Sequence, residues 1–516
     1  MQNMTHPAYA PAPQPAAAKR DKIFAFLFLI GCIFTADYGL LGGFRFGYTL
    51  SATVLALLYV IYAKGKKYTL YGTLCVTLAI LSTTVFSLYT EPLMRLVLFG
   101  QFFLLFAAAI CEMYDVSLFN AASWRAVGDW IRVIFVLPFT GMGKALPALF
   151  RKDPAASGKK GKGGSIILGI LCAVPVLLIV VPLLVRADAA FAKFLSFLSL
   201  DSIPRILLSV IFGTVLFLFL FSHAFPTVRG LNRRAKKTLS QTVFLPAAPL
   251  LSFTGAISFF YILYLVSQIS YFFGAFTGDT PGGFLPANYA RRGFFEMCVI
   301  CVINLIVLFA VILLSRRENG KIHRGVAGLC AFIDLFSIVL IGTAISKMIL
   351  YIRRFGMTAK RLTTSAFMVV LLFVFLALLA RLFIRRFPYM KCIVITTAVI
   401  SIALGLADID TTIAKYNVTA YQSGNLSRID TYQLEQIGAA AVPYIERLAT
   451  DKDPDVAAWA KQELQTRALY GIVTSFPTEE KEEPQEIRSF NLTVKRARNI
   501  LKKYVPKDAA VNILKG

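Results

Sequence analysis

Charged residues are scarce in this chain, and histidines are scarcer still. Of 516 residues only 16% are charged, three are histidines, and 57% are hydrophobic. A soluble protein of this length could not bury so much apolar surface, so the composition excludes a soluble globular protein and indicates an integral membrane protein. His6, His223 and His323 are far apart in the sequence, which argues against a histidine-rich metal site. We expect neither a metal nor a cofactor.

Catalytic motifs are also missing. The sequence contains no GxSxG, HExxH or Walker A spelling, so it assigns no catalytic residue and does not favour an enzyme. The eight cysteines all fall in or beside apolar runs, and none follows Cys392. A disulfide framework is therefore not expected, and the cysteines are typical of small packing residues.

Long apolar runs dominate what is present. A helix needs about 20 apolar residues to cross a bilayer. Eleven runs approach or exceed that length, at residues 23–41, 46–63, 71–88, 93–111, 165–185, 204–222, 250–273, 294–314, 326–346, 364–384 and 389–407. We therefore predict an all-α polytopic membrane protein, with about 11 transmembrane helices in a membrane domain over residues 19–407 and a small helical domain after it.

Two segments of the N-terminal half differ from these runs. Residues 1–18 are rich in proline and alanine and lack periodicity, which predicts a disordered tail. Residues 112–164 form a long cytoplasmic loop, in which apolar residues between 124 and 138 recur at helical spacing. This pattern predicts a helix lying in the membrane interface. Later in the loop, Lys159, Lys160 and Lys162 are placed to bind anionic lipids.

The net charge of +26 belongs to the membrane part. Residues 408–516 hold 15 basic and 15 acidic residues, which leaves 39 basic and 13 acidic residues in 1–407. The excess follows the loops, so we expect no nucleic-acid partner. With a cytoplasmic N-terminus the inner segments hold 27 Lys and Arg and the outer ones 12, and this asymmetry favours an extracytoplasmic C-terminus. One predicted outer connection opposes the rule with Lys347, Arg353, Arg354, Lys360 and Arg361.

Residues 408–516 are predicted to form a soluble helical domain. Asp453 and Pro454 suit the N-cap and first position of a helix, and apolar residues then recur every four positions. With the preceding helix, this segment resembles a single HEAT repeat. One such unit cannot bury its own apolar face. It must pack on helices near 411–437 and 488–504, or on an envelope protein partner.

A charged group precedes the eighth apolar run. Arg291, Arg292 and Glu296 stand at its start, and Arg292 and Glu296 are four residues apart, one turn apart on a helix face. Two interpretations stay open. The group is either an anchor in the membrane interface or part of an anion-binding vestibule.

Asp334 is the most unusual residue inside the apolar runs. An ionised carboxylate in hydrocarbon is costly, so we expect a partner such as Arg381 or His323, or a bound proton. Asn304 and Gln268 could form an intramembrane polar site with it through interhelical hydrogen bonds. Structural pairing and ion or proton handling both stay open for this residue.

Four short stretches carry a family resemblance. They are Ala187-Asp188 with Phe191; Tyr289, Ala290 and Arg291 with Gly293, Phe294 and Glu296; Leu350-Tyr351 with Phe355, Gly356, Thr358 and Arg361; and Tyr416, Asn417 and Val418 with Asp430. These residues resemble a bacterial membrane-protein family catalogued as a domain of unknown function, number 4173 in its series. The resemblance implies a multi-pass protein of the bacterial plasma membrane with an extracytoplasmic tail. It implies no activity.

Under the predicted orientation all four stretches lie on the outer face. We expect one outer surface for an anionic ligand or a partner, built from Asp188, Arg291, Arg292, Glu296, Lys347, Tyr351 and Arg361. The favoured function is a cell-envelope scaffold or sensor. One alternative is a transporter or lipid-handling protein that uses the polar site near Asp334. The other is an outer-face transferase acting on a lipid-linked substrate.

Overall fold

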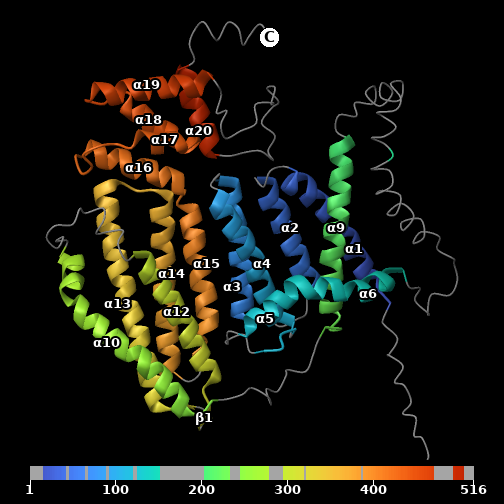
Figure 1. Cartoon of the computed structure of the whole chain (residues 1–516). Coiled ribbons are helices and arrows are strands. Elements are labelled where there is room, and N and C mark those ends of the chain that lie inside the picture. Colours follow the sequence, from blue (N-terminus) through green and yellow to red (C-terminus); the bar gives the residue numbers. More distant parts are fainter. Residues whose placement is uncertain are drawn as a thin grey trace, which may run out of the picture. The chain divides into compact units, whose positions relative to one another are not determined.

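The computed structural model describes residues 16–41, 46–63, 68–88, 92–114, 116–119, 125–150, 180, 203–232, 245–277, 294–318, 321–384, 387–469 and 492–504. These residues are helical almost throughout (Figure 1). The chain divides into two compact units. The first takes its residues from 1–72, 107–117 and 128–235, and the second from 73–106, 118–127 and 236–516.

Among the described residues, ten helices are long and apolar enough to cross a membrane, and the apolar helix α2 (Phe46–Tyr62) is shorter. The predicted class of an all-α polytopic membrane protein is thereby confirmed. Ten of the eleven predicted runs coincide with described helices, and the run at 165–185 lies outside the described residues except for residue 180. The ten candidate spans include residues 126–149, which the sequence predicted as an interfacial helix.

In the first unit, ion pairs join α1 (Lys19–Thr35), with its π-helical extension η1 (Ala36–Leu40), to α9 (Ile203–Val228) at both ends. Asp21 accepts hydrogen bonds from Tyr62 Oη at 2.9 Å and from Arg229 Nε at 3.1 Å. Sixteen residues later in the sequence, about 24 Å along a helix, Asp37 accepts from Arg205 Nε at 2.7 Å. The charged groups of this helix pair therefore stand at either end of its apolar stretch, where ionised groups cost least.

A second helical segment, which belongs to the first unit from Gly128 onward, runs crosswise to α9 (Figure 1). It consists of α5 (Ala126–Ile131), the π-helical turn η2 (Arg132–Val136) and α6 (Leu137–Phe150). A Cβ atom at Gly141 would lie 1.8 Å from the Ser222 carbonyl oxygen of α9, so the crossing requires glycine. Placement of this segment in the membrane interface stays a prediction.

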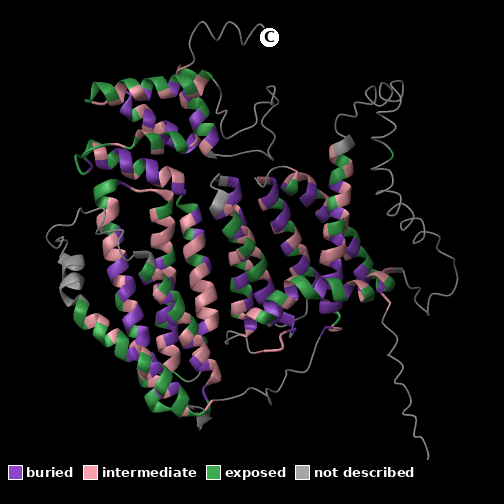
Figure 2. Ribbon diagram, viewed as in Figure 1, coloured by how far each residue is buried: buried purple, intermediate pink, exposed green. Residues whose placement is uncertain are grey.

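The helices α3 (Leu70–Leu88) and α4 (Pro92–Tyr114) contain unit boundaries, and their second-unit parts contact α15. The other helices and strands of the second unit's membrane part are α10 (Ala247–Thr277), α12 (Phe294–Leu314), β1 (Arg317–Glu318), β2 (Lys321–Ile322), α13 (Arg324–Phe355), α14 (Ala359–Phe383) and α15 (Tyr389–Leu406). The two-residue strands pair antiparallel and turn α12 back into α13. Leu308, Leu340 and Phe375 are fully buried at the centre of the resulting core. The helix α10 runs at a slant to α13 and is largely exposed (Figure 2).

The second unit also contains the C-terminal helices. They are α16 (Ile409–Gln422), α17 (Thr431–Gln436), the 3-10 turn η4 (Ala439–Ala441), α18 (Val442–Leu448), α19 (Pro454–Leu469), α20 (Leu492–Leu501) and the 3-10 turn η6 (Lys502–Tyr504). Asp453 Oδ1 accepts from the backbone N–H of Asp455 at 3.0 Å, and α19 begins at Pro454, as predicted. The helix α18 is the buried centre of this group (Figure 2), with α16, α19 and α20 packed against it. The predicted helix pair thus finds its support within the chain.

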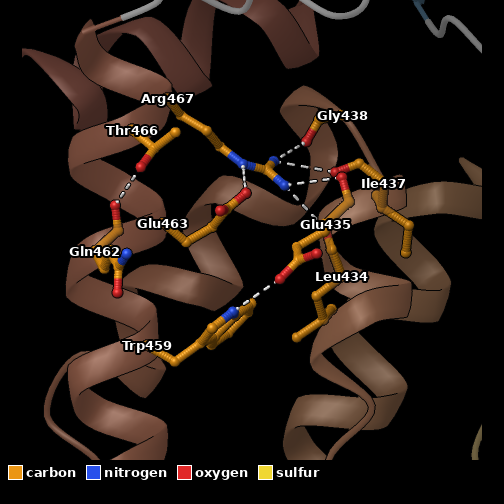
Figure 3. Close-up of polar contacts among 9 residues, drawn as sticks. All are labelled: Leu434, Glu435, Ile437, Gly438, Trp459, Gln462, Glu463, Thr466 and Arg467. Atoms are coloured by element: carbon orange, nitrogen blue, oxygen red, sulfur yellow. Dashed lines mark hydrogen bonds and ion pairs between the residues drawn. The ribbon is translucent and has the colours of Figure 1, made fainter.

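Arg467 joins α19 to the end of α17 (Figure 3). Its guanidinium donates to the backbone carbonyls of Leu434, Glu435, Ile437 and Gly438 at 2.8 to 3.1 Å, and to Glu463 Oε1 at 2.7 Å. These carbonyls belong to the end of α17 and the segment after it, where helices leave acceptors without partners. One side chain therefore satisfies four of them.

Candidate functional site

The turn between α13 and α14 is held by a side chain from α16. Gly356 ends α13 with φ +78°, a conformation that glycine adopts without strain. Asn417 Oδ1 accepts from the backbone N–H of Met357 at 2.7 Å, and Asn417 Nδ2 donates to the Met357 carbonyl at 2.9 Å. Gln433 Nε2 donates to the same carbonyl at 2.8 Å. The C-terminal helices are thereby fixed to the ends of two membrane helices.

Arg361 completes this turn from α14. Its Nη1 donates to the Phe355 carbonyl at 2.9 Å and also to the Gly356 carbonyl. The guanidinium carbon lies 4.2 Å from the centroid of the Tyr351 ring, within the range of a cation–π contact. Arg361 and Tyr351, both predicted to bind an external anion, thus have a structural role at the end of α13.

An open pocket lies beside this turn, which we call the junction pocket. Its volume is about 690 Å³, and it is lined by Arg353, Met357, Thr412, Lys415, Tyr416, Thr419, Ala420, Ser423 and Asn425. Arg353 comes from the last turn of α13 and Lys415 from α16. Within the part of the chain that the structure describes, neither has an ion pair, and no carboxylate lines the pocket. The lining combines two unpaired cations with hydroxyl and amide groups, a composition that suits an anion.

The other predicted surface residues are not gathered at this pocket. Asp188, Arg291 and Arg292 lie outside the described residues, as does the predicted contact between Arg292 and Glu296. Glu296 is exposed in the first turn of α12, and Lys347 is half-buried in α13. The predicted lipid-binding lysines 159, 160 and 162 also lie outside the described residues.

The sequence analysis missed the wall of the junction pocket that α16 supplies. Thr412, Lys415, Thr419 and Ser423 recur three or four residues apart along this helix, so they share one face. The opposite face is buried and includes Ile413 and Val418. The sequence could have revealed this amphipathic pattern. It could not show that Arg353 lies beside the polar face of α16.

A layer of polar side chains crosses three membrane helices of the second unit. Tyr261 Oη of α10 donates to Asn304 Oδ1 of α12. Asn304 Nδ2 in turn donates to Ser337 Oγ of α13 at 2.9 Å, and Ser337 Oγ donates to the Ile333 carbonyl at 2.8 Å. The sequence predicted a polar role for Asn304 but not these partners. The side chain of Gln268, predicted to belong to the same site, lies outside the described residues.

Asp334 stands one turn before Ser337 and is completely buried. Neither of its carboxyl oxygens has a hydrogen-bond partner. The predicted pairing with Arg381 or His323 is therefore wrong. Arg381 Nη1 donates to the Ile384 carbonyl near the end of its own helix, and His323 Nδ1 accepts from the backbone N–H of Gly325 as the N-cap of α13. Both side chains serve backbone groups at helix ends instead.

The first unit holds a buried histidine to which the sequence analysis gave no role. His223 of α9 lies in the core, and its Nδ1 is 3.1 Å from Tyr59 Oη of α2. The Tyr59 ring also packs edge-on against Tyr114. Within the described residues, no cluster of three or more His, Cys, Asp or Glu side chains is arranged to hold a metal ion.

Comparison with known proteins identifies a family. Neither the curated proteins nor the solved structures include a match to this chain. The sequence does match the family described as domain of unknown function DUF4153, over residues 49–448. The resemblance to family 4173 was therefore a misassignment. The stretches behind it are short, and arginine, aromatic and glycine residues of this kind recur wherever helices leave a membrane. The chain belongs to the DUF4153 family.

Proposed function

We propose that this integral membrane protein is a cell-envelope scaffold or sensor that binds a phosphate-bearing anionic head group in the junction pocket. The observation that supports the proposal is that Arg353 and Lys415 both line a pocket to which no described carboxylate contributes. Two like charges beside one cavity repel each other, and an anion between them removes that repulsion. The Thr419 hydroxyl supplies a neutral donor for a further oxygen, whereas the hydroxyls of Thr412 and Ser423 donate to the carbonyls of Ala407 and Ala420.

The position of the pocket favours a lipid or lipid-linked ligand. Arg353 stands in the last turn of α13, a helix long and apolar enough to span the membrane. Basic side chains at such helix ends lie at the depth of lipid head groups. An anionic lipid can therefore reach the pocket by diffusing within the bilayer. If the C-terminus is extracytoplasmic, as predicted, the ligand belongs to the outer leaflet.

The same helix that lines the pocket can transmit binding to the C-terminal helices. The helix α16 carries Lys415 on its polar face and Asn417 on its buried face, and it packs against α18. A ligand that draws Lys415 toward Arg353 would act on α16 as a whole, because a helix moves as a rigid segment. This connection is the reason we propose a sensor or scaffold role. The alternative of an outer-face transferase with a glycosidase-like pair of carboxylates has less support, because no described carboxylate lines the junction pocket.

The test compares anionic and zwitterionic lipid binding by the full chain. Purified protein is placed in detergent, and native mass spectrometry measures binding of phosphatidylglycerol and phosphatidylcholine. Each basic contact with a head group contributes about 1 kcal/mol, so Arg353→Gln with Lys415→Gln should weaken phosphatidylglycerol binding roughly 30-fold. Arg354→Gln is the matched control, since Arg354 is an exposed cation of the same helix turn that does not line the pocket.

Two outcomes would contradict the proposal. Equal losses in the control and the double variant would show a general attraction of basic residues to lipid. Unchanged binding in the double variant would show that the pocket does not bind the lipid.

A second experiment adds inorganic phosphate or glycerol phosphate as a competitor of the lipid. Competition by either at concentrations similar to the lipid would assign the pocket to a soluble phosphate rather than a membrane lipid.

A further inference from the structure

Among the described residues of the second unit, two buried oxygen-bearing side chains lack hydrogen-bond partners. Asp334 of α13 is completely buried, and both of its carboxyl oxygens are unpaired. Ser258 of α10 is 3% exposed, and its hydroxyl oxygen is also unpaired. Buried polar groups are nearly always satisfied, so two exceptions on adjacent helices call for an explanation.

The helix register places these two residues at one level. The chain Tyr261–Asn304–Ser337 links α10, α12 and α13. Ser258 precedes Tyr261 by three residues, and Asp334 precedes Ser337 by three. The helices α10 and α13 run in the same direction, because each begins near the end of α12. The Tyr261 ring also stacks on Phe336 of α13, with centroids 4.1 Å apart, which fixes the same alignment.

Among the residues that the structure describes, no cation pairs with Asp334. The helices packed against α13 are α10, α12 and α14. Their titratable and charged groups toward this region are Tyr261 and Tyr264 of α10, Cys298 and Cys301 of α12, and Arg381 of α14, and α13 itself contributes Cys330 one turn earlier. The tyrosines and thiols are neutral donors, and Arg381 is engaged at the end of α14. An ionised Asp334 would therefore be a buried charge without a partner, which is among the most costly arrangements in a protein.

We propose that Asp334 is a binding site for a transferable proton inside the membrane, with the Ser258 hydroxyl at the same level as its polar neighbour. The two residues offer three unpaired oxygens, whereas hard metal cations take about six oxygen ligands. A proton needs only the carboxyl oxygen that carries it. Release breaks the Asp334 O–H bond, leaves a carboxylate and transfers the proton to a water molecule that reaches the site. Rebinding reverses these steps. This site is separate from the junction pocket and does not depend on the function proposed for it.

Infrared spectroscopy of the full chain in lipid nanodiscs tests the proposal. At neutral pH the wild type should show the carbonyl stretch of a protonated carboxyl, and Asp334→Asn should lack it. The asparagine side chain has nearly the shape of a neutral carboxyl, so the variant is expected to fold, and its gel-filtration profile checks this. Asp408→Asn is the control, because Asp408 lies outside the spans. Ser258→Ala should leave the Asp334 band in place, because the two side chains share no hydrogen bond.

The exchange of the proton is measured by transfer into deuterium oxide. The Asp334 band should move to lower frequency as deuterium replaces hydrogen, which shows that the proton is transferable. A band that persists in Asp334→Asn, or one that never exchanges, would overturn the proposal. So would loss of the band on addition of sodium chloride in place of choline chloride, since that result would show a metal cation at the site.

Discussion

The side-chain amide of Asn417 pairs with both backbone polar groups of Met357, accepting from its N–H at 2.7 Å and donating to its carbonyl at 2.9 Å. The two residues are 60 positions apart in the sequence. The Asn417 side chain thus makes the same two hydrogen bonds that the backbone of a paired β-strand would make. It is 4% exposed, so water cannot readily take its place. The attachment of α16 to the α13–α14 turn therefore depends on this one amide more than on any neighbouring polar group.

Asn417→Asp should weaken that attachment. A carboxylate can still accept from the Met357 N–H, but it faces the Met357 carbonyl with no proton to donate. The Met357 carbonyl keeps its hydrogen bond from Gln433 Nε2, but the carboxylate oxygen that replaces the amide nitrogen becomes a buried acceptor without a donor, which costs about 1–3 kcal/mol. We expect hydrogen exchange, measured by mass spectrometry on the full chain, to accelerate in peptides covering α16 by about 5- to 150-fold.

Asn425→Ala provides the control for this change. Asn425 is an exposed residue whose amide nitrogen donates to Ser423 Oγ at 3.0 Å, so its loss should leave exchange in α16 within about twofold of the wild type. Similar exchange in Asn417→Asp and Asn425→Ala would mean that apolar packing alone holds α16 in place.

Gly356→Ala should disturb the same turn through the backbone. The residue has φ +78° and ψ 174°, a conformation almost confined to glycine that costs a residue with a Cβ roughly 1–3 kcal/mol. The new Cβ atom would also lie 2.8 Å from Asn417 Oδ1. We expect a lower thermal unfolding midpoint in detergent. Gly342→Ala, in open space on the same helix, should be neutral or slightly stabilising, because alanine favours a helix over glycine by about 1 kcal/mol. Equal shifts in both variants would contradict the assigned role of Gly356.

The membrane helices could be predicted from the sequence because bilayer thickness sets their minimum length. Residues 294–314 were predicted as a span and form α12 with the same bounds. The end of α13 could not be found in this way. Its apolar run was predicted to stop at residue 346, whereas the helix continues to Phe355. Hydropathy identifies the apolar part of a helix, and α13 continues past that part with the half-buried Lys347 and the exposed Arg353.

The candidate site was less predictable, because it depends on contacts between distant segments. Arg353 was recognised as part of an unusually basic connection. The second basic residue of the pocket, Lys415, lies 62 residues later, and α16 comes beside Arg353 through its contact with the turn at Gly356. The isolation of Asp334 on its own helix was visible in the sequence. The sequence did not show that Asp334 also lacks partners on the adjoining helices. A basic residue can be found elsewhere in almost any chain, and the sequence does not say whether it reaches the carboxyl.

Asp408 should make stability depend on pH. Burial raises the pKa of its carboxyl, and hydrogen bonds from Thr411 and Thr493 oppose that effect. With the folded pKa above the unfolded value of about 3.9, the folded state holds the proton more tightly. Asp408 therefore contributes stability at low pH that is lost as pH rises from about 4 through the folded pKa.

Asp408→Asn should remove this dependence while keeping the helix cap. Asparagine can still accept from the Thr411 N–H, and it tolerates the left-handed backbone conformation of φ 48° found here. The unfolding midpoint of the variant, relative to wild type, should increase as pH rises from 4 towards neutrality. A difference between the two proteins that stays constant across this range would show that the carboxyl does not titrate with folding.

Arg467→Lys should loosen α17 from α19, although it preserves the charge. The guanidinium reaches four backbone carbonyls and the Glu463 carboxylate at once, and a lysine ammonium has three donors on one atom and cannot span these acceptors. Three of these hydrogen bonds are part-buried and one is exposed, so the loss of two or more should cost about 1–3 kcal/mol. Hydrogen exchange in peptides covering residues 431–438 should report this loss as faster exchange.

Arg447→Lys is the matched control, because Arg447 is exposed and its guanidinium packs over the Tyr444 ring. If the two variants exchange alike, the hydrogen bonds of the Arg467 guanidinium contribute no more to stability than an ordinary surface contact.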